Sequence, residues 1–493
     1  MAAFLSALVA ADRLFHVYVA VYWRVFSRAD PVDRWAKTDF PPMSEVNASN
    51  VRDFPMVVVQ LPMFNEKEVC GNVIDAACSL EWPRSRCLIQ ILDDSTCAET
   101  RARVDDKVFE WRERGVNITH RWRSNRQGYK AGAMAEAMDD LAEYEFAAVF
   151  DADFDPSPDF LYRTVPYLSA NPRVGFVQAR WTFANGDEST LTRVQEISLN
   201  YHMRCEQYAR HAAGLFFNFN GTSGCWRLGC VDDAGGWDCR TTVEDMDLSL
   251  RAYLRGWKFI FLDDVTCVNE IPAGYDAYRK QQHRWSCGPM QLWRKATFAI
   301  WTSDARLAQK LYLIFFFFGT RMFATHVVSF ALYCLLIPIC ATAPEVVIPF
   351  WALVYTPLLV TLSTVAFTKR GWTSAVPYVL YENAMSIVKT TAMLAGLLEW
   401  SNAHEWVVTT KLGKWVANKV DKASKGRLAA VAAKAVAPVA PKKTYGKECA
   451  MGVFFLLCAA YGAWAHDAWK YAIFLCMQGG VFLAFGLNRV DGN

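Results

Sequence analysis

The chain has 493 residues, of which 53% are hydrophobic and 14% aromatic. This size and apolarity exclude a single ordinary soluble domain and predict more than one structural region. The 52 basic and 49 acidic residues leave a net charge of only +3, so no global field favours a nucleic-acid partner. The 15 Cys form no C-x-x-C pair and the chain has only eight His, which argues against a zinc-ligand set or a disulfide framework.

The first region, residues 1–30, is predicted to be an N-terminal membrane anchor. Its apolar stretch, residues 3–26, is interrupted by Asp12 and Arg13 and lacks a small-residue cleavage site, unlike a removed signal peptide. A helix that spans the membrane and one that lies along its interface both fit this pattern.

Residues 51–271 lose the long apolar runs and show short β-rich segments that alternate with helical ones. This pattern predicts an α/β domain built on a parallel sheet. The expected strands are residues 57–61, 88–92, 147–150 and 174–178, and a helix is expected over residues 99–114.

The chain becomes membrane-like from residue 311 to residue 400. Residues 346–367 form the cleanest predicted span, while residues 311–340 contain Arg321. Residues 375–398 carry Glu382 and Lys389, and because charges are costly in lipid, this segment should face protein, line a polar path or lie along the interface.

A basic loop is predicted over residues 401–447, and two C-terminal spans are predicted within residues 448–488, at 450–465 and 469–487. The basic loop fits either a solvated linker or a segment that contacts anionic lipid headgroups.

Acidic residues follow two of the expected strands. Asp93 and Asp94 come directly after residues 88–92, and parallel sheets bind ligands at the carboxyl ends of their strands, so a nucleotide contact is predicted there. An Asx turn or a helix N-cap explains the same residues. Asp151 and Asp153 follow the next strand with D-x-D spacing, which lets two carboxylates address one Mg²⁺ or Mn²⁺ ion and its bound phosphates; the alternative is a surface turn.

Three further segments carry chemically useful side chains. Lys130 lies between Gly128 and Gly132, where it could reach phosphate oxygens, although a helix start explains the segment almost as well. Asp245 is the candidate general base that removes a proton from an attacking hydroxyl, whereas Glu244 fits a capping box with Thr241.

The third of these segments is a Q-x-x-R-W motif formed by Gln281, Arg284 and Trp285. It joins a phosphate-binding guanidinium to a flat ring that suits a sugar face. An amphipathic interfacial helix is the alternative.

All four motifs occur in the order D, D-x-D, E-D, Q-x-x-R-W, and with this set the sequence resembles the processive family 2 glycosyltransferases. It is similar to cellulose, chitin and hyaluronan synthases, and more so to the plant and algal cellulose synthase-like A and C proteins, over most of the chain. The stretches that carry the resemblance are Pro62-Met63-Phe64-Asn65-Glu66, Asp151-Ala152-Asp153-Phe154, Val177-Gln178-Ala179-Arg180-Trp181, Asn220-Gly221-Thr222, Thr242-Val243-Glu244-Asp245-Met246-Asp247 and Gln281-Gln282-His283-Arg284-Trp285-Ser286.

The resemblance implies a GT-A catalytic domain joined to an α-helical transmembrane region, with inversion at the anomeric carbon. Interface helices over residues 272–310 would lead into a channel for the polymer. The implied site residues are Glu66 and Asp93 on the nucleoside, Lys130 on the diphosphate, Asp151 and Asp153 on the metal and nucleotide, Asp245 as base, Gln281, Arg284 and Trp285 around diphosphate and acceptor, and Asn220 and Thr222 at the acceptor.

The A group is associated with (gluco)mannan backbones made from GDP-mannose and the C group with the β-1,4-glucan backbone of xyloglucan made from UDP-glucose. The motifs do not separate the two groups. Mannan synthesis is the favoured interpretation, glucan synthesis is the alternative, and an inactive membrane scaffold is the non-enzymatic alternative. The implied partners are a nucleotide-sugar donor, the growing polysaccharide and the lipid bilayer, in a multi-pass protein of the Golgi membrane. The sequence leaves open whether the protein acts alone, as a homo-oligomer or with an accessory protein.

Overall fold

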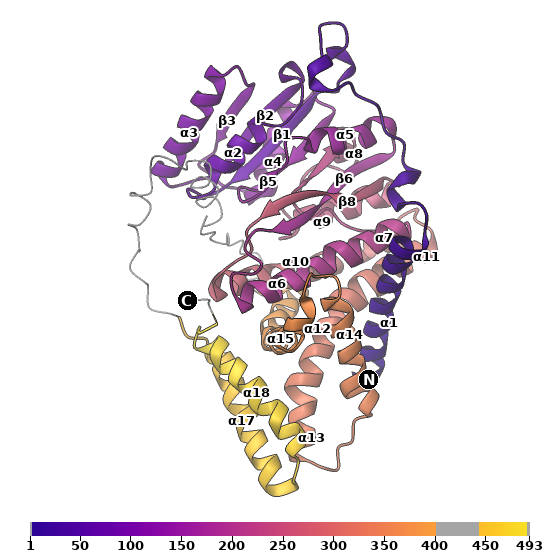
Figure 1. The fold of residues 1–493 in the computed structure, drawn as a ribbon, viewed down its shortest axis with the longest axis vertical. Coiled ribbons are helices and arrows are strands. Elements are labelled where there is room, and N and C mark those ends of the chain that lie inside the picture. The colour runs from indigo at the N-terminus through magenta and orange to yellow at the C-terminus, as the bar shows by residue number, and fades with distance from the viewer. Residues whose placement is uncertain (1, 401–442, 491–493) are drawn as a thin grey trace.

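The computed structural model describes residues 2–400 and 443–490 and shows an α/β domain above a helical region (Figure 1). The α/β domain contains one eight-stranded sheet. Its strands are β1 (Val57–Met63), β2 (Cys87–Asp93), β3 (Ile118–Trp122), β4 (Phe146–Val149), β5 (Asp155–Pro156), β6 (Val174–Phe183), β7 (Gly224–Arg227) and β8 (Lys258–Asn269). The four strands expected from the sequence are confirmed as β1, β2, β4 and β6.

The sheet is mixed, so the expectation of a parallel sheet is wrong for part of it. The strand order is β3-β2-β1-β4-β7-β6-β8-β5, with β1 parallel to β2 and β4. Strand β7 is antiparallel to both of its neighbours, and β5 is antiparallel to β8. A short apolar run such as β7 encodes burial but not strand direction, which the path of the intervening chain decides.

The sheet is buried because helices pack on it. All seven residues of β1 are buried, as expected for a continuous apolar run covered on both faces. The covering helices are α2 (Cys70–Cys78), α3 (Ala98–Glu113), α4 (Tyr129–Ala137) and α5 (Phe160–Ala170). The expected helix over residues 99–114 is thus confirmed as α3.

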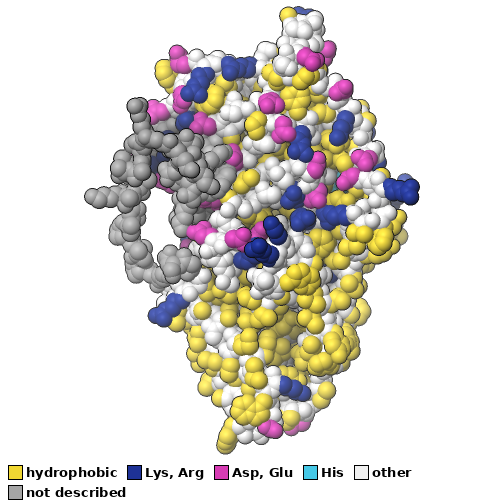
Figure 2. Space-filling model, viewed as in Figure 1, with side chains coloured by type: hydrophobic (Ala, Val, Ile, Leu, Met, Phe, Trp, Pro, Cys, Tyr) yellow, Lys and Arg dark blue, Asp and Glu magenta, His cyan; other side chains and the backbone are white. Residues whose placement is uncertain are grey.

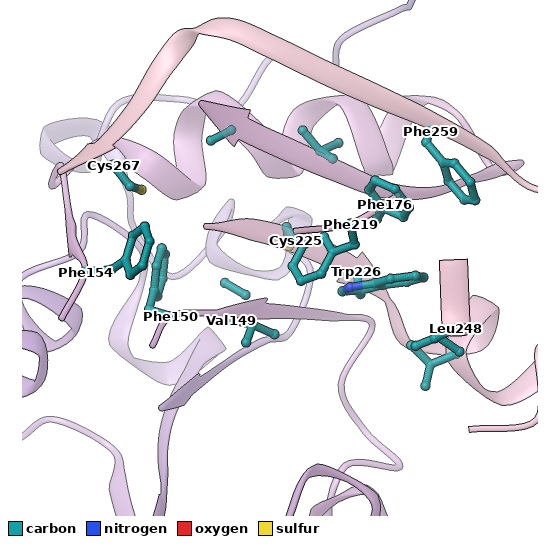
Figure 3. Packing of buried hydrophobic residues seen from close by; sticks show 14 of the residues in the cluster. Val149, Phe150, Phe154, Phe176, Phe219, Cys225, Trp226, Leu248, Phe259 and Cys267 are labelled. Carbon is teal, nitrogen blue, oxygen red and sulfur yellow. The ribbon is translucent and has the colours of Figure 1, made fainter. Parts of the chain in front are cut away.

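Aromatic side chains fill the core on the β6 side of the sheet (Figure 3). Phe176 stacks on Phe259 with ring centroids 4.0 Å apart, and Phe219 and Trp226 pack edge-on at 5.4 Å. Fully burying rings of this size contributes about 1.5–3 kcal/mol each. This core supports the loop that follows Phe219, which the candidate site uses.

Further helices lie in the α/β domain and in the helical region below it. They are α1 (Ala2–Val21), η1 (Tyr22–Phe26), α6 (Thr190–Tyr201), η7 (His202–Gln207), α7 (Tyr208–Ala212), α8 (Leu228–Asp233), α9 (Glu244–Leu254), α10 (Tyr275–Thr302), α11 (Leu307–Leu311), η8 (Tyr312–Ala324), α12 (Thr325–Phe330), η9 (Ala331–Leu336), α13 (Ile337–Thr342), η10 (Trp351–Tyr355), α14 (Thr356–Val365), η11 (Gly371–Ser374), α15 (Ala375–Leu398), α17 (Gly446–His466) and α18 (Trp469–Gly486). Helix α10 runs between the α/β domain and the lower helices (Figure 1).

Four helices in the described residues are long and apolar enough to span a membrane: Ala3–Phe26, Leu307–Thr342, Gly446–His466 and Trp469–Gly486. Hydrophobic side chains dominate the visible surface of this lower region, whereas charged side chains gather on the α/β domain (Figure 2). Three of these candidates coincide with apolar segments that the sequence marked at the two ends of the chain, and the chain is that of a membrane protein.

The cleanest predicted span, residues 346–367, is not the best one in the structure. Its helix comprises η10 and α14, with 5 and 10 residues, which rise about 22 Å against the roughly 30 Å of a bilayer core. Pro344 and Pro349 precede this helix, and proline disfavours helical geometry in the residue before it. The length of the apolar run therefore predicted a longer helix than the structure contains.

Helix α15 contains the charged pair of residues 375–398, Glu382 and Lys389, and the structure shows where these side chains lie. Lys389 Nζ donates to Glu382 Oε2 at 2.6 Å, and both side chains line a cavity among the helices. Of the three placements expected for this segment, the structure shows one in which the charged pair faces a cavity within the protein. The predicted basic loop falls almost entirely on residues 401–442, which lie outside the described residues.

All 15 Cys lie within the described residues and are free thiols, as expected.

Candidate active site

A cavity of roughly 180 Å³ lies where the carboxyl ends of β1, β2 and β4 meet the start of α9 and the middle of α10. Sheets with parallel strands commonly bind ligands in a crevice at the carboxyl ends of these strands. The functional side chains in its wall are Phe64, Glu66, Asp94, Arg126, Lys130, Asp151, Asp153, Trp181, Asn220, Glu244, Asp245, Glu270, Gln281, Arg284 and Trp285.

The ends of β1 and β2 are tied together by Asn65, which has a left-handed backbone (φ 53°). Its Oδ1 accepts from the backbone N–H groups of Thr96 and Cys97 at 3.0 and 2.9 Å, and its own N–H donates to Ser95 Oγ at 2.8 Å. Asparagine is among the few non-glycine residues that adopt this conformation readily. The turn places Glu66 in the cavity wall.

Asp93 does not line the cavity, although it was predicted to contact the nucleoside. Its carboxylate is fully buried, accepts from Ser95 N at 2.8 Å and lies 3.1 Å from His120 Nε2. Burial alone would raise the pKa of Asp93, but the bonds from His120 and Ser95 outweigh it and lower that pKa. Asp93 thus makes the Asx turn that was its alternative interpretation, and its neighbour Asp94 lines the cavity while pairing with Arg123.

Arg126 is a cavity residue that the sequence interpretation missed. Its guanidinium lies over the Phe64 ring, 3.4 Å from the centroid, and its backbone has φ 45°. A left-handed, non-glycine residue costs free energy, which the cation–π contact offsets in part. The feature that distinguishes Arg126 is its positive φ, just before the Gly128-Tyr129-Lys130 segment, and a backbone angle cannot be read from the sequence.

Lys130 is the second residue of α4 and enters the cavity because of the glycines around it. A Cβ at Gly132 would lie 1.9 Å from the Gln127 carbonyl oxygen, so only glycine allows this tight entry into the helix. Lys130 Nζ donates to Asp151 Oδ1 at 2.5 Å and to the Gly221 carbonyl at 2.8 Å. Burial would lower the Lys130 pKa, but the carboxylates of Asp151, Glu244 and Asp245 outweigh it and raise that pKa, so the side chain is a cation.

Asp151 and Asp153 both line the cavity, as the D-x-D spacing predicts for two carboxylates addressing one ion. The described residues contain no cluster of three or more His, Cys, Asp and Glu side chains that could enclose a metal. Two carboxylates still suit Mg²⁺ or Mn²⁺, because such ions commonly take one or two protein oxygens and complete their shell with phosphate and water. Thr222 does not line the cavity; it is buried, and its Oγ1 accepts from Asp151 N at 2.9 Å.

Asp245 and Glu244 begin helix α9, and the predicted capping box of Thr241 with Glu244 is absent. Val243 occupies the N-cap position without a side-chain bond, and Glu244 is the first helical residue, so it lies too early to serve a capping box. Glu244 therefore faces the cavity. Burial, and then the neighbouring Glu244 carboxylate, raise the pKa of Asp245 to about 7.

Helix α10 carries Gln281, Arg284 and Trp285 into the cavity wall. It approaches the segment before α9 closely at Gly288, where a Cβ would lie 2.5 Å from Val243 Cγ1. Burial lowers the pKa of Arg284, although the carboxylates of Glu244 and Asp151 oppose the shift. Arginine stays charged under such shifts, so Arg284 supplies a positive charge opposite the acidic wall.

Gln281 and Trp285 also line a second cavity of roughly 320 Å³ that extends among the lower helices. Asn220 and Asp245 belong to both cavities. Besides Asp245, eight of the ten predicted residues line the first cavity, whereas Asp93 and Thr222 do not. The eight are Glu66, Lys130, Asp151, Asp153, Asn220, Gln281, Arg284 and Trp285.

Comparisons with known proteins agree on the family. A profile described as "Glycosyl transferase family group 2" matches residues 148–367, and one described as "Glycosyl transferase family 2" matches residues 58–227. Glucomannan 4-beta-mannosyltransferase 9 of Arabidopsis thaliana is 43% identical over 440 residues, which cover 89% of this chain and 81% of the relative. Glucomannan 4-beta-mannosyltransferase 1 of Cyamopsis tetragonoloba is 43% identical over 443 residues, covering 89% and 82%.

A solved structure shares the fold. The mannosyltransferase PcManGT from Pyrobaculum calidifontis, solved in complex with GDP-Man and Mn²⁺, superposes with a TM-score of 0.51 at 18% identity over 81% of this chain and 99% of that one. The α/β domain is therefore a GT-A fold, as expected. With relatives above 40% identity over most of both chains, this protein belongs to glycosyltransferase family 2, in the group that contains the glucomannan 4-beta-mannosyltransferases.

Proposed function

We propose that this protein is an inverting, processive membrane mannosyltransferase that extends a β-1,4-linked (gluco)mannan backbone from GDP-mannose. The observation that carries the proposal is one cleft in which an acidic D-x-D pair, two cations and a carboxylate with raised pKa face each other. Its mannose specificity rests on the full-length likeness to glucomannan 4-beta-mannosyltransferases. Its place in the Golgi membrane is part of the proposal.

In the proposed reaction Asp245 accepts the proton of the acceptor hydroxyl. The hydroxyl oxygen then bonds to the anomeric carbon as the bond from that carbon to the donor phosphate oxygen breaks, with inversion. A pKa near the working pH suits a general base, because the group is ionised yet basic enough to take the proton. Asp245 Oδ1 accepts from Met246 N at 2.7 Å, which fixes the carboxylate at the helix start.

The departing nucleoside diphosphate gains negative charge as the bond breaks. Lys130 and Arg284 line the same cleft and stabilise that charge as preorganised cations. Asp151 and Asp153 would hold a Mg²⁺ or Mn²⁺ ion, which when bound offsets the charge of the donor diphosphate. Trp285 offers an aromatic face for the acceptor sugar.

The function is tested by supplying purified, membrane-reconstituted protein with radiolabelled GDP-mannose or UDP-glucose and Mg²⁺ or Mn²⁺. We expect insoluble product from GDP-mannose that β-mannanase degrades. Endoglucanase-sensitive product from UDP-glucose alone would instead establish the glucan-synthase alternative. Donor binding without product from either sugar would favour the inactive scaffold.

The acid limb of the pH profile provides a second test. Because Asp245 must be deprotonated to accept a proton, kcat/KM should fall as pH drops through about 7 and be about tenfold below its plateau one unit lower. Glu244→Gln removes the neighbouring negative charge, so the limb should shift to lower pH. An unshifted limb in that variant would show that another group controls the profile.

A further inference from the structure

Asn220 occupies the junction of the two cavities and belongs to the walls of both. The next residue, Gly221, provides the carbonyl that accepts from Lys130 Nζ, and a Cβ placed on Gly221 would lie 3.3 Å from Asp245 Oδ2. Asn220 therefore directly precedes a residue that lies beside both the cation and the base.

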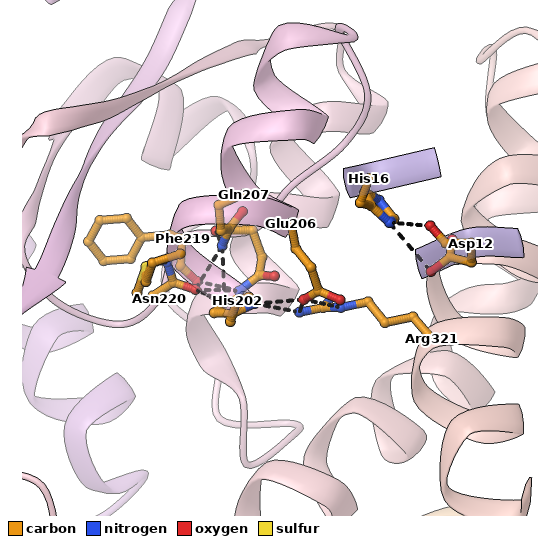
Figure 4. Close-up of polar contacts among 10 residues, drawn as sticks. Asp12, His16, His202, Glu206, Gln207, Phe219, Asn220 and Arg321 are labelled. Atoms are coloured by element: carbon orange, nitrogen blue, oxygen red, sulfur yellow. Dashed lines mark hydrogen bonds and ion pairs between the residues drawn. The ribbon is translucent and has the colours of Figure 1, made fainter. Parts of the chain in front are cut away.

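The side-chain oxygen of Asn220 is held by donors from η7. Gln207 Nε2 donates to Asn220 Oδ1 at 2.9 Å, and His202 Nε2 lies 3.2 Å from the same oxygen (Figure 4). Within the described part of the chain, Asn220 Nδ2 makes one contact, at 3.8 Å to Met203 Sδ. A thioether is a weak acceptor, so the amide keeps its capacity to donate to a sugar hydroxyl.

The support of Asn220 continues into a membrane helix. His202 and Glu206 are one helical turn apart, with His202 Nδ1 3.0 Å from Glu206 Oε2. Arg321 of η8 places Nη2 3.0 Å from His202 Nδ1 and 3.3 Å from Glu206 Oε2 (Figure 4). Arg321 belongs to the candidate span Leu307–Thr342. A chain of contacts therefore joins that span to the loop that carries Asn220.

This ion pair is nearly buried: Arg321 is 12% and Glu206 8% exposed. Burial of two charges costs desolvation that their attraction often only balances, so stability alone is a weak reason for the pair. Charges within membrane segments characteristically mark functional sites. The pair fixes the rotamer of His202 through contacts with Nδ1. The other ring nitrogen, Nε2, lies against Asn220 Oδ1.

We propose that Arg321, Glu206 and His202 are positioning residues that set the orientation of Asn220, so that the η8 membrane segment aligns the terminal acceptor sugar with Asp245. The inference rests on the proposed function, since it takes Asn220 to contact the acceptor sugar. It assigns to η8 an effect on acceptor affinity with no effect on the donor.

A double-mutant cycle tests this coupling in the full-length, membrane-reconstituted protein. One arm combines Arg321→Met with Glu206→Gln, which removes both charges together and leaves neither stranded. The other arm is Asn220→Ala. Each arm should weaken binding of β-1,4-mannohexaose by about tenfold, and the combined variant should be no weaker than Asn220→Ala alone, because both arms remove one positioned contact. Donor KM should stay within about twofold of wild type.

An ion pair with a buried carboxylate, outside both cavities, serves as the control. Arg279 Nε donates to Glu448 Oε1 at 3.0 Å, with Glu448 1% exposed, and neither residue lines the two cavities. Arg279→Met combined with Glu448→Gln should act independently of Asn220→Ala, so any losses multiply. Multiplying losses in the Arg321 cycle as well would overturn the proposal, as would equal effects on donor and acceptor.

Two further arms keep the test decisive. If the Arg321→Met, Glu206→Gln protein fails to fold, Arg321→Lys retains the charge but cannot reach both partners with a planar fork, and it should show the same selective loss of mannohexaose binding. If wild type binds cellohexaose instead, the proposed mannan specificity fails, and the same cycle is read with that ligand. Binding of neither oligosaccharide by wild type overturns the inference.

Discussion

Asp245→Asn should reduce polymer synthesis by about 10²–10⁴-fold while leaving the Kd for GDP-mannose within a few-fold of wild type. The amide has nearly the shape of the carboxylate but cannot accept the hydroxyl proton, and general-base catalysis contributes a factor of this size. The measurement is initial-rate incorporation of labelled mannose at pH 8, paired with equilibrium binding of the donor.

The thermal midpoint of Asp245→Asn should equal or exceed that of wild type at pH 8. Burial raises the pKa of Asp245 in the folded protein to about 7. The destabilisation from ionising this carboxylate therefore grows from its unfolded pKa near 3.8 up to about pH 7 and is fully present at pH 8. The neutral amide removes that penalty. Loss of both stability and activity would indicate a structural role instead.

Asp247 supplies the matched control, since it lies one position beyond Met246 on the same helix. It is fully buried and accepts from Arg240 Nε at 3.1 Å and Arg251 Nε at 3.0 Å, away from the cavity. Asp247→Asn should therefore lower the thermal midpoint, because two cations lose their counter-charge, yet keep the turnover per folded molecule. Wild-type activity in Asp245→Asn would refute the assignment of the base.

Asp153→Asn should weaken metal-dependent binding of GDP-mannose by on the order of 100-fold, because one of two carboxylates that would hold the ion is lost. Chelation of divalent ions should remove donor binding in wild type and have little further effect on the variant. Titration of GDP-mannose with and without Mn²⁺ measures both effects.

Asp155 is the matched control for this prediction. It lies two residues further along the same acidic run, in β5, and does not line the cavity. Asp155→Asn should leave metal-dependent donor binding unchanged. Equal losses in Asp153→Asn and Asp155→Asn would show that general disturbance of the strand, not metal binding, weakens the donor.

Several elements of the fold and the site were accessible from the sequence because their signals are local. Strands β1, β2, β4 and β6 are apolar runs that neighbouring residues alone define. The residues after such strands gather at one sheet edge wherever the strands are parallel, which is why Asp94 after β2 and Asp151 and Asp153 after β4 meet in one cavity. Their order along the chain sufficed to indicate a family 2 glycosyltransferase.

Other features depended on contacts between distant segments. Adjacent Asp93 and Asp94 carry the same side chain, and only the packing of β2 beside β3 turns Asp93 toward His120 and Asp94 toward the cavity. Glu244 reaches the cleft because helix α9 starts at that residue. The capping box expected between Thr241 and Glu244 placed the start of this helix too early.

The sequence by itself determined the chemistry of this protein, because the D-x-D pair, Asp245 and the Q-x-x-R-W motif are each encoded within a few residues. The tertiary structure decided which neighbours face the cleft, the mixed direction of the sheet, and the length of the η10–α14 helix. It alone joined Arg321 to Glu206, His202 and Asn220. The contacts of Arg321 with Glu206 and His202 link residues 115 and 119 positions apart, and their geometry arises from packing that no local pattern encodes.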